Sequence, residues 1–241
     1  MFRFYFVIAT SVISFLIFSY RYHKMNKYPD KYTDKDRYDL ARMACNCVRK
    51  RGRVTTHVFG KEKLPENGGY IMYPNHQGKY DAIAIMLAHD TPCSFVVDSQ
   101  RSKVKLLNEV TDLVHGERLD KHDIKGQVKS ILNISKAVSD GKRYIMFPEG
   151  GYGEKVEDNI VHEFLPGAFK AATNSKCPIV PVAIVDSYKV FLKNSLRRVN
   201  CQLHFLDPIP YEVYKDMKTI EISEMVHSLI ENKIAEVVNE A

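Results

Sequence analysis

The chain has 241 residues, of which 27% are charged and 45% are hydrophobic. These values are typical of one globular domain of ordinary size, and they exclude a disordered or fibrous chain. The net charge of +6 suits an anionic membrane surface or phosphorylated substrates. No nucleic-acid-binding motif accompanies this charge, so we expect no nucleic-acid partner.

Five cysteines are spread along the chain, without a C-x-x-C pair and without a metal-ligand spacing to histidine. The odd number argues against a disulfide framework. We therefore expect a reduced, intracellular protein with no metal site.

Residues 4–20 carry no charge and are rich in Phe, Ile, Leu and Val. A helix of this length is ~25 Å long, which is the short end for crossing a bilayer. We interpret residues 1–25 as a membrane anchor that either spans the membrane or lies half-immersed in it. More positive charge follows the segment than precedes it, which places the following residues in the cytoplasm. The alternatives are a cleaved signal peptide, which lacks a small-residue cleavage site here, and a buried apolar helix of a soluble chain.

Residues 26–53 are predicted to be a helical linker at the membrane surface. Residues 26–36 are polar and contain Pro29, whereas residues 37–50 place apolar side chains at helical spacing. The basic side chains of this region either lie on anionic head groups or form an ordinary solvated helix face.

Residues 54–241 alternate between candidate strands and helices and are predicted to form the catalytic domain. This alternation predicts one α/β domain with a mixed, partly parallel sheet flanked by helices. The expected strands are residues 54–59, 69–73, 94–98, 143–147, 179–185 and 202–206, and the expected helices are residues 82–89, 103–114, 123–139, 167–175 and 219–240.

A histidine and an aspartate stand at the point where one of these strands passes into a helix. His76 follows the apolar run 70–73, and Asp81 opens the apolar run 82–88. On a regular helix the two positions would be about 140° apart, so contact requires a turn, for which Gly78 supplies flexibility. A second pair with the same spacing, His115 and Asp120, lacks this context. We predict that His76 and Asp81 form a catalytic pair, against the alternative of a capped helix start with an incidental histidine.

The stretch N-H-Q-G-K-Y-D at residues 75–81 resembles the N-H-x(4)-D signature of the glycerolipid acyltransferases, the family of 1-acylglycerol-3-phosphate acyltransferases. Residues 147–150 match that family's F-P-E-G block, and residues 178–182 match its later V-P-V-type block. The three blocks occur in the family's order, and the similarity runs from about residue 54 to residue 208.

The resemblance implies an enzyme that moves a fatty acyl group from an acyl thioester to the free hydroxyl of 1-acylglycerol 3-phosphate, giving phosphatidate. His76 is suited to act as the general base, with Asp81 orienting its ring. The acceptor supplies the attacking oxygen, so no enzyme nucleophile is needed, and no serine lies in a G-x-S-x-G frame. We expect acyl-CoA or acyl carrier protein as donor, a lysophospholipid as acceptor, no cofactor, and a catalytic domain facing the cytoplasm from an anionic membrane.

Cationic side chains are expected to bind the phosphate of the acceptor. A family motif that usually ends in I-D-R is similar to residues 117–121, with Lys121 in place of the arginine and Arg118 three residues earlier. Either residue, or both, would bind phosphate, and the alternative is a charged loop in water. Lys105 is a weaker candidate.

The F-P-E-G block also contributes candidates: Glu149 is expected to orient its loop, and Gly150 forms the turn beside the substrate. The family's F-P-E-G-T-R sequence departs at its end, where Gly151 and Tyr152 replace Thr and Arg. A tyrosine cannot replace an arginine at a bidentate phosphate site, and Lys155 is the candidate to compensate. This departure leaves open another acceptor, such as glycerol 3-phosphate or another lysolipid. A thioesterase and a lipid-binding protein without turnover are the remaining alternatives.

Overall fold

The computed structural model describes residues 2–120, 122–152, 159–193 and 195–240. Lys121 and Lys155, two of the candidates for binding phosphate, lie outside these residues. A seven-stranded sheet has the strand order β1-β7-β6-β2-β5-β3-β4, and of the neighbouring strands only β6 and β7 pair antiparallel. The strands are β1 (Val54–Phe59), β2 (Tyr70–Pro74), β3 (Cys93–Asp98), β4 (Glu117–Leu119), β5 (Arg143–Ile145), β6 (Ile179–Val185) and β7 (Val199–Phe205).

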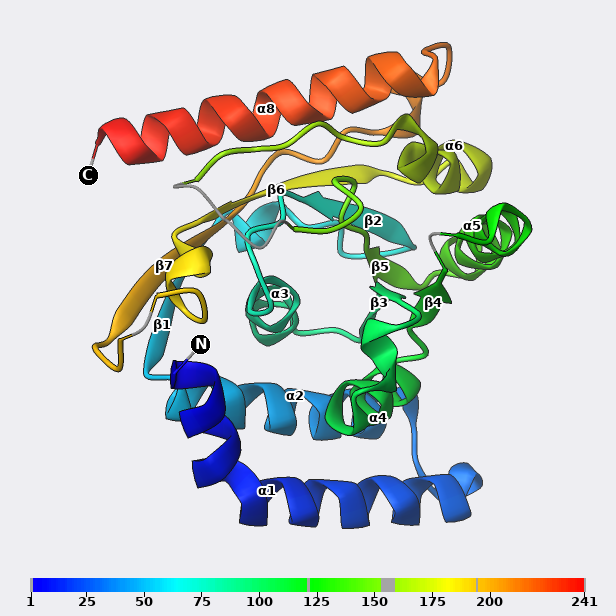
Figure 1. The fold of residues 1–241 in the computed structure, drawn as a ribbon. Coiled ribbons are helices and arrows are strands. Elements are labelled where there is room, and N and C mark those ends of the chain that lie inside the picture. The colour runs from blue at the N-terminus through cyan, green and yellow to red at the C-terminus, as the bar shows by residue number, and fades with distance from the viewer. Residues whose placement is uncertain (1, 121, 153–158, 194, 241) are drawn as a thin grey trace.

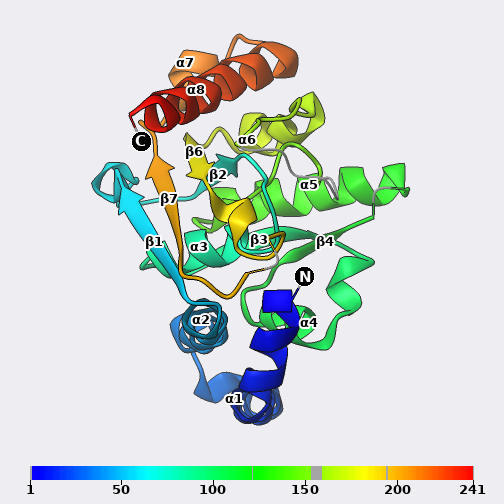
Figure 2. The ribbon, with the colours of Figure 1, turned by 60° about the vertical axis from the view of Figure 1, so that its left-hand side comes forward.

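Helices cover both faces of this sheet (Figures 1 and 2), which confirms the predicted mixed α/β fold. One face packs against α1 to α4, and the other packs against α5, α6 and α8. The helices are α1 (Phe2–Lys27), α2 (Asp34–Arg51), α3 (Asp81–Ala88), α4 (Lys105–Leu113), α5 (Ile124–Ser139), α6 (Lys170–Ser175), α7 (Tyr211–Tyr214) and α8 (Thr219–Asn239).

The central strand β2 is apolar throughout because both of its faces are buried. Tyr70 and Met72 belong to the core under one face, whereas Ile71 and Tyr73 belong to the core under the other. All four side chains are buried, as expected for a parallel strand between two helical layers. The residues that follow β2 therefore lie at the side of the sheet where the carboxyl ends of its parallel strands are found.

Strand β4 and helix α2 are among the elements that differ from the prediction. Strand β4 is missing from it, because its sequence Glu-Arg-Leu has neither an apolar run nor an alternating pattern, and it forms only three pairs with β3. Helix α2 begins three residues earlier than predicted. Thr33 and Asp36 form a capping box there, in which each side chain accepts a hydrogen bond from the other residue's backbone N–H.

The N-terminal helix α1 is held against the rest of the chain at both ends. The buried side chain of Arg3 donates hydrogen bonds to the carbonyl oxygens of Val190, at 3.2 Å, and Arg197. Near the other end, Ser19 Oγ donates to Glu109 Oε1 of α4 at 2.7 Å. The helix bends between these attachments and runs along the domain (Figure 1). The predicted division into anchor, linker and catalytic domain stays a prediction.

The outward face of α1 is apolar and exposed. By length and composition, α1 is the one helix in the described part of the chain that could cross a membrane. Its large exposed side chains are Phe2, Tyr5, Ile8, Val12, Ile13, Leu16, Ile17 and Tyr20. Since burying exposed apolar area is favourable, this face is suited to a lipid surface.

Candidate active site

The predicted pair His76 and Asp81 lies in contact at the carboxyl end of β2. His76 Nδ1 and Asp81 Oδ2 are 2.8 Å apart. Strand β2 ends at Pro74 and α3 begins at Asp81, so the turn between them brings the two side chains together. The competing pair does not form, because His115 Nε2 instead contacts Asp34 Oδ1, at 3.2 Å, on the exposed surface.

The carboxyl group of Asp81 is completely buried and surrounded by donors. Its Oδ2 also accepts hydrogen bonds from the backbone N–H groups of Gln77, at 2.6 Å, and Gly78, at 2.8 Å. Its Oδ1 accepts a short hydrogen bond from Ser187 Oγ. A buried carboxyl group at the start of a helix needs such partners, and the helix dipole of α3 favours negative charge there.

This arrangement fixes the tautomer of His76. An ionised carboxylate only accepts, so the proton of the neutral imidazole resides on Nδ1 and Nε2 keeps a free lone pair. Among the described residues, Nε2 makes no hydrogen bond, and the side chain is 14% exposed. In this tautomer, Nε2 of His76 is available to accept a hydrogen bond.

Gly78 has a different role from the predicted one. It is not among the residues with positive φ, and a Cβ placed on it would meet open space. The turn therefore does not require a glycine. What the turn uses at this position is the backbone N–H, which is bonded to Asp81.

The end of β6 and the residues that follow it hold the turn of residues 75–81 from the side. The amide group of Asn75 exchanges two hydrogen bonds with the backbone of Ile184, at 2.7 and 3.0 Å. The side-chain oxygen of Gln77 accepts from the backbone N–H of Ser187 at 3.0 Å. Ser187 was not predicted, because nothing in its own neighbourhood distinguishes it from a loop serine.

The F-P-E-G block packs against His76. The ring of Phe147 stacks on His76, with centroids 4.0 Å apart and an interplanar angle of 26°. Glu149 Oε1 accepts a hydrogen bond from the backbone N–H of His76 at 2.8 Å. Burial raises the pKa of Glu149 to about 8, and Asp81 adds to this, so the acid is largely neutral at pH 7. Glu149 does not line the groove beside His76, and its assignment as a substrate-binding residue stays a prediction.

A groove of about 660 Å³ opens in front of His76. A volume of this size is ordinary for a small-molecule site. Gly150 lines it, with a φ of +69° that favours glycine, and a Cβ there would lie 2.7 Å from Leu165 Cδ1. The remaining walls are mainly apolar, including Phe95, Leu107, Leu119, Ile124, Val128, Ile131, Leu132, Met146, Phe147 and Leu165.

The two described candidates for binding phosphate lie outside this groove. Arg118 Nη2 is bonded to Asp112 Oδ1, at 2.5 Å, and to Asn108 Oδ1, at 2.8 Å. Lys105 extends into solvent, with its nitrogen 4.0 Å from Glu109. Neither lines the groove, and their assignment as phosphate ligands stays a prediction.

Three other cations line the groove among the described residues: Lys79, Arg101 and Lys170. The ammonium group of Lys79 lies 4.5 Å from the centroid of Phe4 on α1. The guanidinium group of Arg101 lies 4.4 Å from the centroid of Tyr152. Sequence reasoning missed Arg101, because it follows β3 in a polar stretch without a motif.

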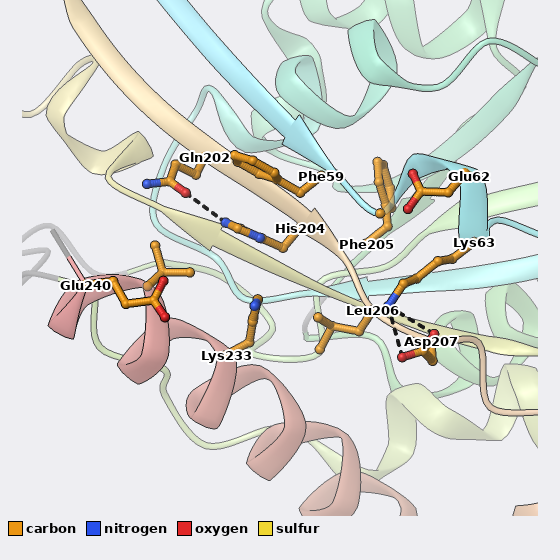
Figure 3. Close-up of a pocket in the computed structure, with 12 residues that line it drawn as sticks. Phe59, Glu62, Lys63, Gln202, His204, Phe205, Leu206, Asp207, Lys233 and Glu240 are labelled. Carbon is orange, nitrogen blue, oxygen red and sulfur yellow. Dashed lines mark hydrogen bonds and ion pairs between the residues drawn. The ribbon is translucent and has the colours of Figure 1, made fainter.

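A second groove lies between β1, β7 and α8 (Figure 3). The ring of Phe59 stacks on His204, at 4.6 Å between centroids, and His204 Nε2 lies 2.9 Å from Gln202 Oε1. Burial, aided by Lys233, lowers the pKa of His204 to about 4. No described residue lines both grooves, and the three sequence blocks contribute no described residue to this one. The predicted residues His76 and Gly150 thus line the first groove and not this one.

The chain is similar to proteins named as acyltransferases. A 1-acyl-sn-glycerol-3-phosphate acyltransferase of Cocos nucifera is 23% identical over 193 residues, which are 77% of this chain and 62% of that protein. A probable 1-acyl-sn-glycerol-3-phosphate acyltransferase of Mycoplasma genitalium is 26% identical over 135 residues, which are 54% of this chain and 49% of that protein. The chain thus spans less than two thirds of the length of these relatives.

The same fold occurs in a solved structure. The crystal structure of PlsC, the 1-acyl-sn-glycerophosphate (LPA) acyltransferase of Thermotoga maritima, matches with a TM-score of 0.76 and 20% identity, covering 98% of this chain and 93% of that one. A family model described as Acyltransferase matches residues 55–185, which is more than half of the sequence. Since this match includes the turn of His76 and Asp81, the F-P-E-G block and all of β6, the chain belongs to the Acyltransferase family.

Proposed function

We propose that this protein transfers a fatty acyl group from an acyl thioester to the free hydroxyl of 1-acylglycerol 3-phosphate, giving phosphatidate. The observation that carries the proposal is the His76–Asp81 pair, whose free Nε2 lies at an apolar groove. The acceptor in this proposal is taken from the names of the relatives in Cocos nucifera and Mycoplasma genitalium.

In the proposed reaction, His76 Nε2 takes the proton of the acceptor hydroxyl while the hydroxyl oxygen attacks the thioester carbonyl carbon. A C–O bond forms and the C–S bond breaks. The departing thiolate then takes the proton from the imidazolium, which returns His76 to its neutral form. Asp81 stabilises the imidazolium and keeps the ring in the orientation that the transfer needs.

Direct transfer, without an acylated enzyme, agrees with the composition of the groove. Among the described residues that line it there is no serine, threonine or cysteine. Ser187 is buried behind Asp81 and donates to it, so its hydroxyl is not presented to a substrate. We therefore expect no burst of acylated enzyme in rapid-mixing kinetics.

The apolar walls suit an acyl chain. Ile124, Val128 and Leu132 follow each other at intervals of four residues on α5, are exposed, and line the groove. A chain lying there removes apolar surface from water, at about 0.8 kcal/mol for each buried CH₂ group. The donor in this proposal is acyl-CoA or acyl carrier protein, with no cofactor.

The proposal also includes the membrane, where the acceptor lipid resides. Both ends of α1 are attached to the catalytic domain, so we infer that α1 lies half-immersed in the bilayer with its exposed apolar face in lipid. The contact between Lys79 and Phe4 places the start of α1 next to the catalytic turn. The basic residues after the apolar segment support a domain on the cytoplasmic side of the cytoplasmic membrane.

A second acceptor is supported by one specific feature, the tyrosine at position 152 in place of the family's arginine. Glycerol 3-phosphate, or another lysolipid, would use the same base and groove. A thioesterase would use them to activate water instead.

The test is product formation by the purified protein in mixed micelles, with labelled acyl-CoA or acyl carrier protein. The acceptors are 1-acylglycerol 3-phosphate, glycerol 3-phosphate, an uncharged 1-acylglycerol, or none. Labelled phosphatidate from the first acceptor is expected. Product from a different acceptor alone would mean that this acceptor is the substrate. Release of free fatty acid at the same rate without acceptor would mean that the protein is a thioesterase.

A further inference from the structure

Tyr152 lies between the catalytic histidine and an arginine that comes from another part of the chain. Its ring meets the imidazole of His76 edge to face, with centroids 4.6 Å apart and an interplanar angle of 86°. The guanidinium carbon of Arg101 lies 4.4 Å from the centroid of the same tyrosine ring. These separations place the guanidinium group within about 9 Å of the imidazole centroid.

The guanidinium group of Arg101 contacts Tyr152, and its charge is unpaired among the described residues. No described carboxylate lies within ion-pairing distance of it, whereas Arg118 is paired with Asp112. Asp98, the only acid among the described residues of the groove, accepts hydrogen bonds from the backbone N–H groups of Gln100 and Arg101, at 2.9 and 3.0 Å. Asp98 thus stabilises the turn that presents Arg101.

We propose that Arg101, supported by the ring of Tyr152, binds the phosphate group of the acceptor and so replaces the arginine that is missing from the F-P-E-G block. The inference rests on the proposed function. It assigns a residue to the acceptor site that the sequence did not suggest, and it explains how Tyr152 is compatible with a phosphorylated acceptor.

The chemistry of the acceptor fits this spacing. In 1-acylglycerol 3-phosphate the free hydroxyl and the phosphate are on neighbouring carbons. Hydrogen bonds of ~2.8 Å at both ends bring an imidazole and a guanidinium to a comparable separation. A guanidinium group also offers paired N–H donors to a phosphate, and an aromatic face holds its plane in position. Lys79 and Lys170 lack this paired geometry.

The experiment compares wild type, Arg101→Ala and Lys103→Ala in steady-state acyl transfer. Lys103 is the matched control, because it belongs to the same short helix, Arg101–Lys103, does not line the groove, and donates to Gln100 Oε1 instead. For Arg101→Ala we expect the KM for 1-acylglycerol 3-phosphate to rise about tenfold or more, from the loss of charged hydrogen bonds. The KM for the acyl donor and the rate with uncharged 1-acylglycerol should stay at the wild-type values, and Lys103→Ala should behave as wild type.

The outcomes separate the two proposals. An unchanged acceptor KM in Arg101→Ala, with an active wild type, would overturn this inference alone. A rise in the KM for acyl-CoA instead would assign the arginine to the phosphates of the donor and also overturn it. A wild type that forms no acylated product from any phosphorylated acceptor would remove the proposed function and this inference with it.

Discussion

Glu149 Oε1 accepts a hydrogen bond from the backbone N–H of His76 at 2.8 Å, so the F-P-E-G turn holds His76 through its main chain. The other carboxyl oxygen, Oε2, is buried and has no partner among the described residues. Burial is the larger cause of the raised pKa of Glu149, and Asp81 is a second one. A neutral acid at this position can accept the bond from His76 without adding a second buried charge beside Asp81.

This pKa predicts a pH dependence of stability. A carboxyl group with a folded-state pKa of about 8 binds more protons than in the unfolded chain, where the pKa is 4.5. Between about pH 4.5 and pH 8 the unfolded chain has lost this proton, whereas the folded protein keeps it. The free energy of unfolding therefore falls as the pH rises through this range, by up to ~1.4 kcal/mol for each pH unit. Glu149→Gln keeps the acceptor oxygen and removes the charge. Denaturant unfolding from pH 5 to 8.5 should show a flatter profile for Glu149→Gln, and parallel profiles would contradict this assignment.

Ser187→Ala tests the support of Asp81. The substitution leaves Asp81 Oδ1 buried without its donor, which should lower the free energy of unfolding by about 1–3 kcal/mol. We also expect kcat to fall while the acceptor KM stays close to wild type, because Ser187 does not line the groove. Chemical denaturation and acyl-transfer kinetics measure the two effects. Wild-type kcat in a destabilised variant would limit Ser187 to a structural role.

Gly150 and Gly78 differ in whether they can be replaced by alanine without loss of stability. Gly150→Ala places a Cβ 2.7 Å from Leu165 Cδ1 at a φ of +69° and should cost about 1–3 kcal/mol of stability. Gly78→Ala is the control, since its Cβ would meet open space, and it should unfold at nearly the wild-type denaturant concentration. Equal stability of the two variants would mean that the turn at Gly150 relaxes freely.

The exposed face of α1 predicts membrane binding. Ile13 and Leu16 are 75% and 65% exposed, and replacing both by Glu should weaken binding to anionic vesicles by tenfold or more. Ile220→Glu on α8 is the control, because this side chain is 51% exposed on a different helix. Vesicle sedimentation measures binding, and unchanged unfolding curves show that the fold is intact. Equal binding of the double variant and wild type would exclude this face as the lipid contact.

The sequence predicted the parts of the fold that are locally apolar and missed those set by long-range contacts. Strands β2 and β6 are continuous apolar runs, so their positions could be predicted within one residue. The contact of His76 with Asp81 could be predicted as well, because both residues stand at one strand-to-helix turn.

The surroundings of this pair could not be predicted. Ser187 reaches Asp81 from 106 positions further along the chain, and Arg101 joins Tyr152 from a polar stretch after β3. Arg118 stands close to the expected motif, yet Asp112 and Asn108 on the preceding helix bind its guanidinium group. Such pairings depend on which side chains the order of the strands brings together. This order cannot be predicted from the spacing of residues that are close in the sequence.

The most direct measurement of the central claim is the rate of phosphatidate formation by wild type, His76→Ala and His115→Ala at saturating acyl donor and 1-acylglycerol 3-phosphate. His115 has the same sequence spacing to an aspartate but contacts Asp34 on the exposed surface, so it is a matched control. Loss of the base in His76→Ala should lower kcat by about 10²–10⁴-fold, and His115→Ala should keep the wild-type rate. A folded His76→Ala variant with the wild-type rate would contradict the assignment of His76 as the general base.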